Sequence, residues 1–169
     1  PMKKIDLRTE SKRMLADVYT PVSIYLRLRD RFRDTILLES TDAHVAENSY
    51  SFICIGAIGG IEVKDAKTIE IKYPNQDPIK QHVTTAQIDN QLWSYMQGYQ
   101  VVPHAHKETS FAQGLFGYTS FDAIPLFETI SFADAKKINV PLIRYRLYQY
   151  VIVFDHYKDE LFICQNLLA

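Results

Sequence analysis

Glu39 and Ser40 are the residues whose position most clearly indicates a chemical role. They follow three consecutive apolar residues in the stretch DTILLESTD (34–42). Such an apolar run predicts a buried strand, and a carboxylate and a hydroxyl are unfavourable at its buried end unless they are hydrogen bonded. Two interpretations therefore stay open: the strand reaches solvent at this point, or its end binds a polar group.

Two other polar pairs could have a functional role: His104 with His106 as metal ligands, and Asp155 with His156 as an acid–base pair. The histidines of PHAHKE could supply two metal ligands, but no cysteine or third histidine lies near them in the sequence, so a solvated loop is favoured. Asp155 and His156 lie in a polar stretch between two apolar runs, which favours a turn. The sequence has no phosphate-binding loop, dinucleotide fingerprint, nucleophile elbow or zinc-ligand spacing.

Three segments are predicted to be helical. The first begins at Thr20-Pro21, a hydroxyl N-cap followed by proline at the first helical position. The second covers 84–99 and ends near Gly98, and the third is a short stretch over 121–130 that Asp122 is expected to cap. The apolar stripes expected on the first two helices are Val22, Tyr25, Leu28 and Phe32, and Ile88, Leu92, Tyr95 and Met96.

The remaining apolar segments are short, rich in aromatic and β-branched residues, and predict strands. Segment 49–63 reads as two apolar runs separated by a turn near Gly59-Gly60. Segment 114–121 reads as a strand in which Gly114 and Gly117 indicate close backbone approach or a bulge. The other predicted elements are a strand at 67–73, a loop at 73–82, and a hairpin formed by 141–156 and 159–166. Several hairpins with few helical crossovers indicate an α+β fold with a mainly antiparallel sheet.

Composition places the chain among ordinary globular proteins and predicts one domain over residues 1–169. The 19 basic and 20 acidic residues give a net charge of −1, which offers no reason to expect nucleic acid or an anionic membrane as a partner. No stretch reaches the roughly 18 apolar residues of a membrane span, and the N-terminus has no apolar signal region. Cys54 and Cys164 are expected to be buried free thiols, as in a reducing cytoplasm.

Five short motifs, in order along the chain, resemble the N-terminal region of anthranilate synthase component I, a member of the chorismate-utilising enzymes. Any one of them alone would be weak, but together they cover nearly the whole sequence. They are TPV (20–22), LLES (37–40), SYSFI (49–53), GYTSFD (117–122) and VFDH (153–156).

The resemblance implies that the chain is one lobe of a larger enzyme. That enzyme converts chorismate and ammonia to anthranilate and pyruvate, and a glutamine amidotransferase subunit supplies the ammonia. Its catalytic residues and Mg²⁺ site belong to a C-terminal catalytic domain that this sequence does not contain, so we expect no catalytic residue, metal or cofactor in the chain and no activity from it alone. The apolar ending FICQNLLA favours a truncated chain.

The resemblance also implies a site for tryptophan, the feedback inhibitor, at Leu38, Glu39, Ser40 and Tyr50. Glu39 suits the ligand ammonium, because a charge-assisted hydrogen bond is roughly twice as strong as a neutral one. The family often has basic residues where this chain has Ser49 and Tyr50. Since the rest of that pocket comes from the catalytic domain, we expect the chain alone to bind tryptophan weakly or not at all.

Two alternatives remain open from sequence. One is aminodeoxychorismate synthase component I of the same superfamily, with isochorismate and salicylate synthases less favoured because LLES is intact. The other is a stand-alone amino-acid-binding module without a catalytic domain. Product analysis with chorismate and ammonia separates the enzymes, and the length of the reading frame separates an enzyme from a module.

Overall fold

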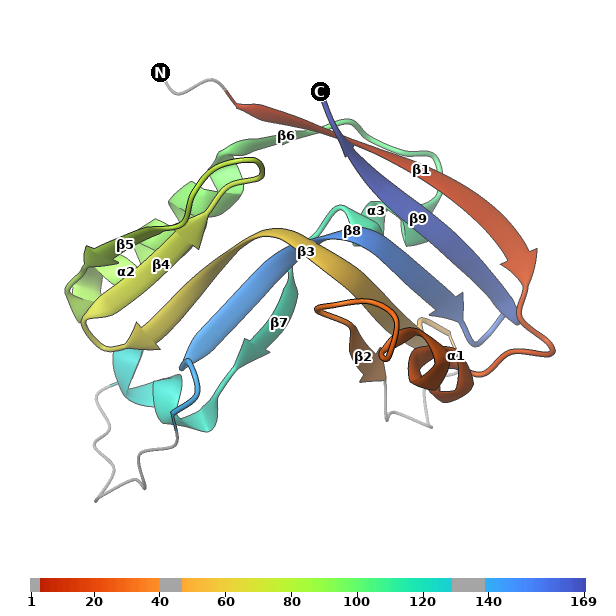
Figure 1. Ribbon diagram of the computed structural model, residues 1–169, viewed down its shortest axis with the longest axis horizontal. Coiled ribbons are helices and arrows are strands. Elements are labelled where there is room, and N and C mark those ends of the chain that lie inside the picture. Colours follow the sequence, from red (N-terminus) through yellow and green to blue (C-terminus); the bar gives the residue numbers. More distant parts are fainter. Residues whose placement is uncertain (1–3, 40–46, 129–138) are drawn as a thin grey trace. The chain divides into compact units, whose positions relative to one another are not determined.

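A computed structural model describes residues 4–39, 47–128 and 139–169 (Figure 1). Its contacts divide the chain into two compact units. The first unit contains Ile58–Tyr99 and Leu115–Arg146, and the second contains Ile5–Ala57, Gln100–Gly114 and Leu147–Ala169. The strand pairs with an assigned register among the described residues are antiparallel, which confirms the predicted α+β fold with a mainly antiparallel sheet.

The sheet of the first unit has the strand order β5-β4-β3-β8, and β7 also pairs with β8. These strands are β3 (Tyr50–Asp65), β4 (Thr68–Lys72), β5 (Ile79–His82), β7 (Phe116–Thr119) and β8 (Ile143–Asp155). The predicted strand at 67–73 is confirmed as β4, whose Ile69 and Ile71 are buried. The loop prediction for 73–82 is wrong at its end, because β5 pairs there with β4.

Helix α2 (Thr85–Gln97) covers the apolar face of this sheet (Figure 1). Its predicted start is confirmed: Thr84 is the N-cap and forms a capping box with Gln87. Ile88 and Tyr95 are buried in the core, but Met96 is 45% exposed, so its place in the apolar stripe was wrong. At 3.6 residues per turn Met96 lies about 80° around the helix from Ile88, at the edge of the buried face.

Gly59 and Gly60 do not form a turn, contrary to the prediction, but lie inside the continuous 16-residue strand β3. Glycine is needed at both positions because a side chain there would collide with neighbouring atoms. A Cβ on Gly59 would lie 2.9 Å from the Tyr95 hydroxyl, and one on Gly60 would lie 2.9 Å from the backbone oxygen of Tyr145. Gly117 on β7 is tighter still and confirms the predicted close approach, since its Cβ would lie only 1.7 Å from the backbone oxygen of Arg144.

The short helix after β7 is a 3₁₀ helix, η1 (Phe121–Leu126). The predicted helix at 121–130 is thus confirmed for its first part, and 129–130 lie outside the described residues. Ser120 is its N-cap, so the prediction for Asp122 was wrong; Asp122 lies in the first turn instead.

The second unit is built on β3, β8, β9 (Glu160–Leu168), β1 (Ile5–Leu15) and β6 (Tyr99–Val101), in that order, with β2 (Ile36–Glu39) pairing with β3. The predicted hairpin is confirmed by the β8–β9 register from Tyr150↔Gln165 to Asp155↔Glu160. Strand β1 was not predicted. It pairs with β9 along its length and lies beside it in Figure 1.

Helix α1 (Pro21–Leu28) begins as predicted, with Thr20 as its N-cap and Ser23 completing a capping box. Its apolar face differs from the prediction: Val22 is 45% and Phe32 49% exposed. The helix ends before Phe32, and the residues that pack on the buried cluster of Ile53, Ile55, Phe154 and Leu161 are Ile24, Tyr25 and Leu28.

Helix α3 (Lys107–Ala112) begins directly after the two histidines of PHAHKE. The loop prediction holds for His104 and His106, which lie outside any helix or strand, and is wrong for Lys107 and Glu108. Side-chain hydrogen bonds hold the helix in place. Thr109 Oγ1 donates to Ser11 Oγ over 2.8 Å, and Asn166 Nδ2 donates to the backbone oxygen of Ala112 over 2.7 Å. The sequence carries no signal for such long-range contacts.

Candidate functional site

The predicted effector residues lie on the β2–β3 ladder, where Leu38 is opposite Phe52 and Glu39 is opposite Ser51. Because side chains alternate between the two faces of a sheet, Leu38 and Tyr50 share one face, and Glu39 shares the other face with Ser51. The structure therefore brings Leu38 and Tyr50 to a common face and does not place the Glu39 side chain there. Ser40 lies outside the described residues.

Glu39 is the last residue of β2 and is exposed, after three half-buried apolar residues. On its face of the ladder Ser51 is buried, and the Ser51 Oγ lies 2.6 Å from His156 Nε2. The backbone N–H of His156 donates to the backbone oxygen of Ser49 over 3.1 Å. These bonds connect the turn after β8 to the start of β3. The predicted turn role of the Asp155–His156 pair is confirmed, because β8 ends at Asp155 and His156 begins the turn to β9.

Tyr50 is half-buried in an aromatic cluster. Its ring centroid lies 5.0 Å from that of Phe111 in an edge-on arrangement, and the Phe52 and Phe111 centroids are 5.8 Å apart. The Lys107 Nζ lies 5.6 Å from the Tyr50 centroid and 5.7 Å from that of Phe111, within the range of a cation–π interaction. The positive charge beside Tyr50 therefore comes from α3.

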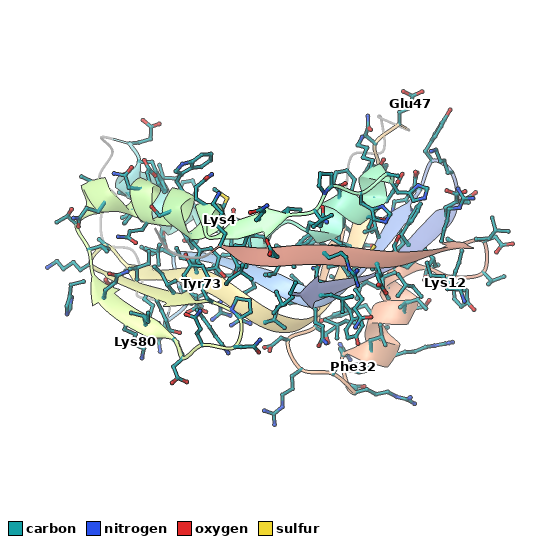
Figure 2. All side chains as sticks on the ribbon, turned by 90° about the horizontal axis from the view of Figure 1, so that it is seen from above. Lys4, Lys12, Phe32, Glu47, Tyr73 and Lys80 are labelled. Carbon is teal, nitrogen blue, oxygen red and sulfur yellow. The ribbon has the colours of Figure 1, made fainter. Side chains whose placement is uncertain are left out.

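A cavity of about 430 Å³ opens beside Tyr50. Three segments of the second unit line it: the turn before β3, which includes Glu47 (labelled in Figure 2), the start of α3, and the turn between β8 and β9. Asn48 shapes the first turn with a left-handed backbone (φ 68°), a conformation in which asparagine is enriched. The cavity volume is within the roughly 300–1,000 Å³ of small-molecule sites.

Two buried carboxylates lie in the cavity wall. Asp155 is 3% exposed, and its Oδ1 accepts hydrogen bonds from the backbone N–H groups of Tyr157 (3.0 Å) and Lys158 (3.1 Å). Glu108 is 6% exposed. Burial raises the pKa of the Tyr50 phenol, and the negative charges of Asp155 and Glu108 raise it further. The Tyr50 hydroxyl therefore stays protonated and can donate a hydrogen bond at neutral pH.

The two histidines of PHAHKE do not form a metal centre with their described neighbours. Their ring centroids are 5.7 Å apart, the His106 ring packs against Phe162, and the His106 backbone N–H donates to His104 Nδ1 over 3.2 Å. Within the described part of the chain, no three histidine, cysteine or acidic side chains are placed to bind one metal ion.

Sequence reasoning missed Lys107 and Glu108, because it treated the segment around PHAHKE as a loop. A glutamate that follows a lysine in a polar segment is usually exposed. Nothing in the neighbouring sequence indicates that Glu108 is buried. The two cysteines, in contrast, are free and buried as expected. None of the helices in the described ranges has the length and apolar character needed to cross a membrane.

The chain is similar to proteins named anthranilate synthase component 1. It is 25% identical over 158 residues to the protein of Lactococcus lactis subsp. lactis, covering 92% of this chain and 32% of that protein. It is 28% identical over 163 residues to the Acinetobacter calcoaceticus protein (90% and 31%), and 23% identical over 155 residues to that of Thermus thermophilus (92% and 31%).

The chain thus spans about a third of the length of these curated relatives. No known protein-family model matches it. The resemblance drawn from the five motifs is confirmed, since relatives of this one name match about nine tenths of the chain.

Proposed function

We propose that this chain is the N-terminal domain of an anthranilate synthase component 1 and contributes the amino-acid effector site to that enzyme. The observation that carries the proposal is the similarity over about nine tenths of the chain to relatives of that one name. The whole enzyme would convert chorismate and ammonia to anthranilate and pyruvate in tryptophan biosynthesis. A glutamine amidotransferase subunit would supply the ammonia, and the C-terminal domain would hold the catalytic residues and Mg²⁺.

The site chemistry fits a free amino acid as the effector. Tryptophan presents an ammonium, a carboxylate and a large apolar ring, and therefore needs an acceptor, a donor and an apolar wall. Leu38 and the aromatic cluster of Tyr50 offer the wall, and the exposed end of β2 at Glu39 offers an acceptor. Ser40, next in the chain, would add a hydroxyl. The two buried free thiols agree with a reducing, cytoplasmic location.

The test uses the longer enzyme that contains this chain, assayed by anthranilate fluorescence with chorismate and ammonia. We expect anthranilate formation that tryptophan inhibits. Glu39→Gln and Ser40→Ala should each weaken inhibition while turnover without tryptophan is unchanged; Glu10→Gln, at an exposed position of β1, is the matched control. A parallel loss of turnover would make the two residues structural. Formation of 4-amino-4-deoxychorismate without pyruvate release would instead assign the chain to aminodeoxychorismate synthase.

A further inference from the structure

Three buried side-chain donors have no hydrogen-bond partner among the described residues, and all three belong to β7, β8 or the residue after β7. They are the Tyr118 hydroxyl, the Ser120 hydroxyl and the Nε–H of Arg144. Buried polar groups in folded proteins are nearly always hydrogen bonded, because the bonds that they made to water are otherwise lost. Three such donors in one part of the sheet indicate that an acceptor is missing there.

The β7–β8 register places these three groups on one face of the sheet of the first unit (β7 lies beside β8 in Figure 1). Tyr118 is directly opposite Arg144, so the two side chains share a face. The backbone N–H of Ser120 donates to the backbone oxygen of Leu142 over 2.8 Å, which continues the ladder by one residue. Because side chains alternate along a strand, Ser120 shares the face of Tyr118, and Ile143 belongs to the opposite face, which α2 covers.

Two arginines on this face share a single carboxylate. Arg144 Nε lies 2.6 Å from Glu62 Oε1, which makes an ion pair, but the Nε–H is not aligned for a hydrogen bond with any acceptor in the described ranges. The same Glu62 oxygen accepts a hydrogen bond from Arg146 Nη2 over 3.4 Å. Glu62 is 14% exposed, whereas the Arg144 side chain is 35% exposed and can be reached from solvent.

The neighbouring carboxylate, Glu70, does not offset the charge of the two arginines. It lies opposite Glu62 on β4 and forms ion pairs with Lys64 and Lys80, whose Nζ atoms are 3.3 and 3.7 Å from its Oε2 (Lys80 is labelled in Figure 2). Glu62 and Glu70 thus have two cationic partners each. This arrangement leaves a net positive charge beside the three donors, which attracts an anion and repels a cation.

We propose that Tyr118, Ser120 and Arg144 bind an oxyanion group of a ligand, a carboxylate or a phosphate. Either group accepts several hydrogen bonds, and a guanidinium can donate two parallel ones to it. The two hydroxyls can rotate to donate to the same group. A neutral ligand would leave the excess positive charge unbalanced. The site belongs to the first unit, whereas the proposed effector residues belong to the second, so it does not rest on the proposed function.

The test is an NMR titration of the isotope-labelled chain with inorganic phosphate and, separately, with acetate. Sodium chloride keeps the ionic strength constant, and a titration with sodium chloride alone measures the effect of charge without oxygen acceptors. We expect saturable shifts at 117–120 and 143–146 with at least one of the two oxyanions, and no saturable shifts with chloride. The oxyanion that binds more tightly identifies the ligand group as a phosphate or a carboxylate.

Three variants remove one donor group each: Tyr118→Phe, Ser120→Ala and Arg144→Gln. A hydrogen bond to a charged group contributes about 1.5–3 kcal/mol, so each variant should weaken binding by roughly 10- to 100-fold. Thr119→Val is the matched control for the hydroxyls, because the Thr119 hydroxyl already has a partner on the other face of the sheet. Arg13→Gln, at an exposed position of β1, is the matched control for the arginine. Both controls should bind within about twofold of wild type.

Urea unfolding of the free chain separates a binding role of the hydroxyls from a structural one. A buried hydroxyl without a partner lowers stability, so Tyr118→Phe and Ser120→Ala should leave the urea midpoint unchanged or raise it. Ser120 is the N-cap of η1 but makes no side-chain cap hydrogen bond, so its replacement removes no cap interaction. A lower midpoint in both variants would show that the hydroxyls have structural partners, which contradicts the inference.

Three binding results would also overturn the inference: no saturable shifts with either oxyanion, shifts confined to other segments, or unchanged affinity in both Tyr118→Phe and Ser120→Ala. The two hydroxyl variants decide the matter even if Arg144→Gln fails to fold. None of these results contradicts the proposed function, which is decided by anthranilate formation and its inhibition in the longer enzyme.

Discussion

Asn166 holds α3, and with it Lys107 and Glu108, in place against the strands of the second unit. It is 4% exposed and uses both ends of its amide: Nδ2 donates to the backbone oxygens of Ala112 (2.7 Å) and Tyr148 (2.8 Å), and Oδ1 accepts from Thr9 Oγ1 (2.6 Å). Replacing it with alanine removes three buried hydrogen bonds at once.

The expected cost follows from those three bonds. At about 0.5–1.5 kcal/mol of net stability each, Asn166→Ala should lower the free energy of unfolding by about 2–4 kcal/mol. Asn166→Asp should cost more, although it has nearly the same shape, because it turns a carboxylate oxygen towards two backbone oxygens that need a donor. The order of the two variants therefore tests the hydrogen bonds rather than the packing.

Urea unfolding followed by circular dichroism measures both variants, and Gln100→Ala, at an exposed position in the same unit, is the matched control. We expect the control to stay within about 0.5 kcal/mol of wild type, as surface substitutions usually do. An Asn166→Ala loss no larger than the control, or an Asn166→Asp variant more stable than Asn166→Ala, would refute this account of how α3 is held.

Three further predictions concern the glycine contact, a phenol and a thiol. Gly117→Ala should destabilise the chain by about 1–3 kcal/mol in thermal unfolding, as overpacking does, because its Cβ would meet the backbone oxygen of Arg144; a gain in stability would contradict this. Burial raises the pKa of Tyr99 from 10.0 to about 12, so the protonated phenol favours the fold below pH 10 and this contribution is lost as the pH rises towards 12. Tyr99→Phe should therefore flatten the fall in urea stability over that range, and an unchanged slope would exclude Tyr99 as its source. Burial likewise raises the pKa of Cys164 to about 12, so iodoacetamide at pH 8 should modify Cys164 only after denaturant is added, as peptide mass spectrometry would show.

Elements with a strong local signal were predictable from the sequence. Thr20 and Thr84 mark helix starts through purely local interactions: the Thr20 hydroxyl accepts the backbone N–H of Ser23, and the backbone N–H of Thr84 donates to the Gln87 side chain. Strand β4 and the β8–β9 hairpin could likewise be predicted, because the alternation of apolar and polar residues and the polar turn are also local patterns. The general fold class followed from these parts.

What the sequence did not predict depends on distant partners. Gly59 and Gly60 suggested a turn, yet both lie in the extended strand β3, where Gly60 pairs with Lys72 of β4. Atoms of Tyr95 and Tyr145 occupy the space that side chains at these two positions would need. Helix α3 has six residues and no side-chain cap hydrogen bond, so tertiary bonds such as that from Asn166 determine its position. For the same reason the burial of Glu108 could not be read from its neighbours in sequence.

The β2–β3 register decides how Glu39 can act on a ligand that contacts Tyr50. Leu38 and Tyr50 share a face, and a slip of one residue in the ladder would move Leu38 to the opposite face and Glu39 onto theirs. In the observed register the Glu39 side chain meets such a ligand only around the end of β2. The carboxylates that share the cavity wall with Tyr50 are Glu108 and Asp155.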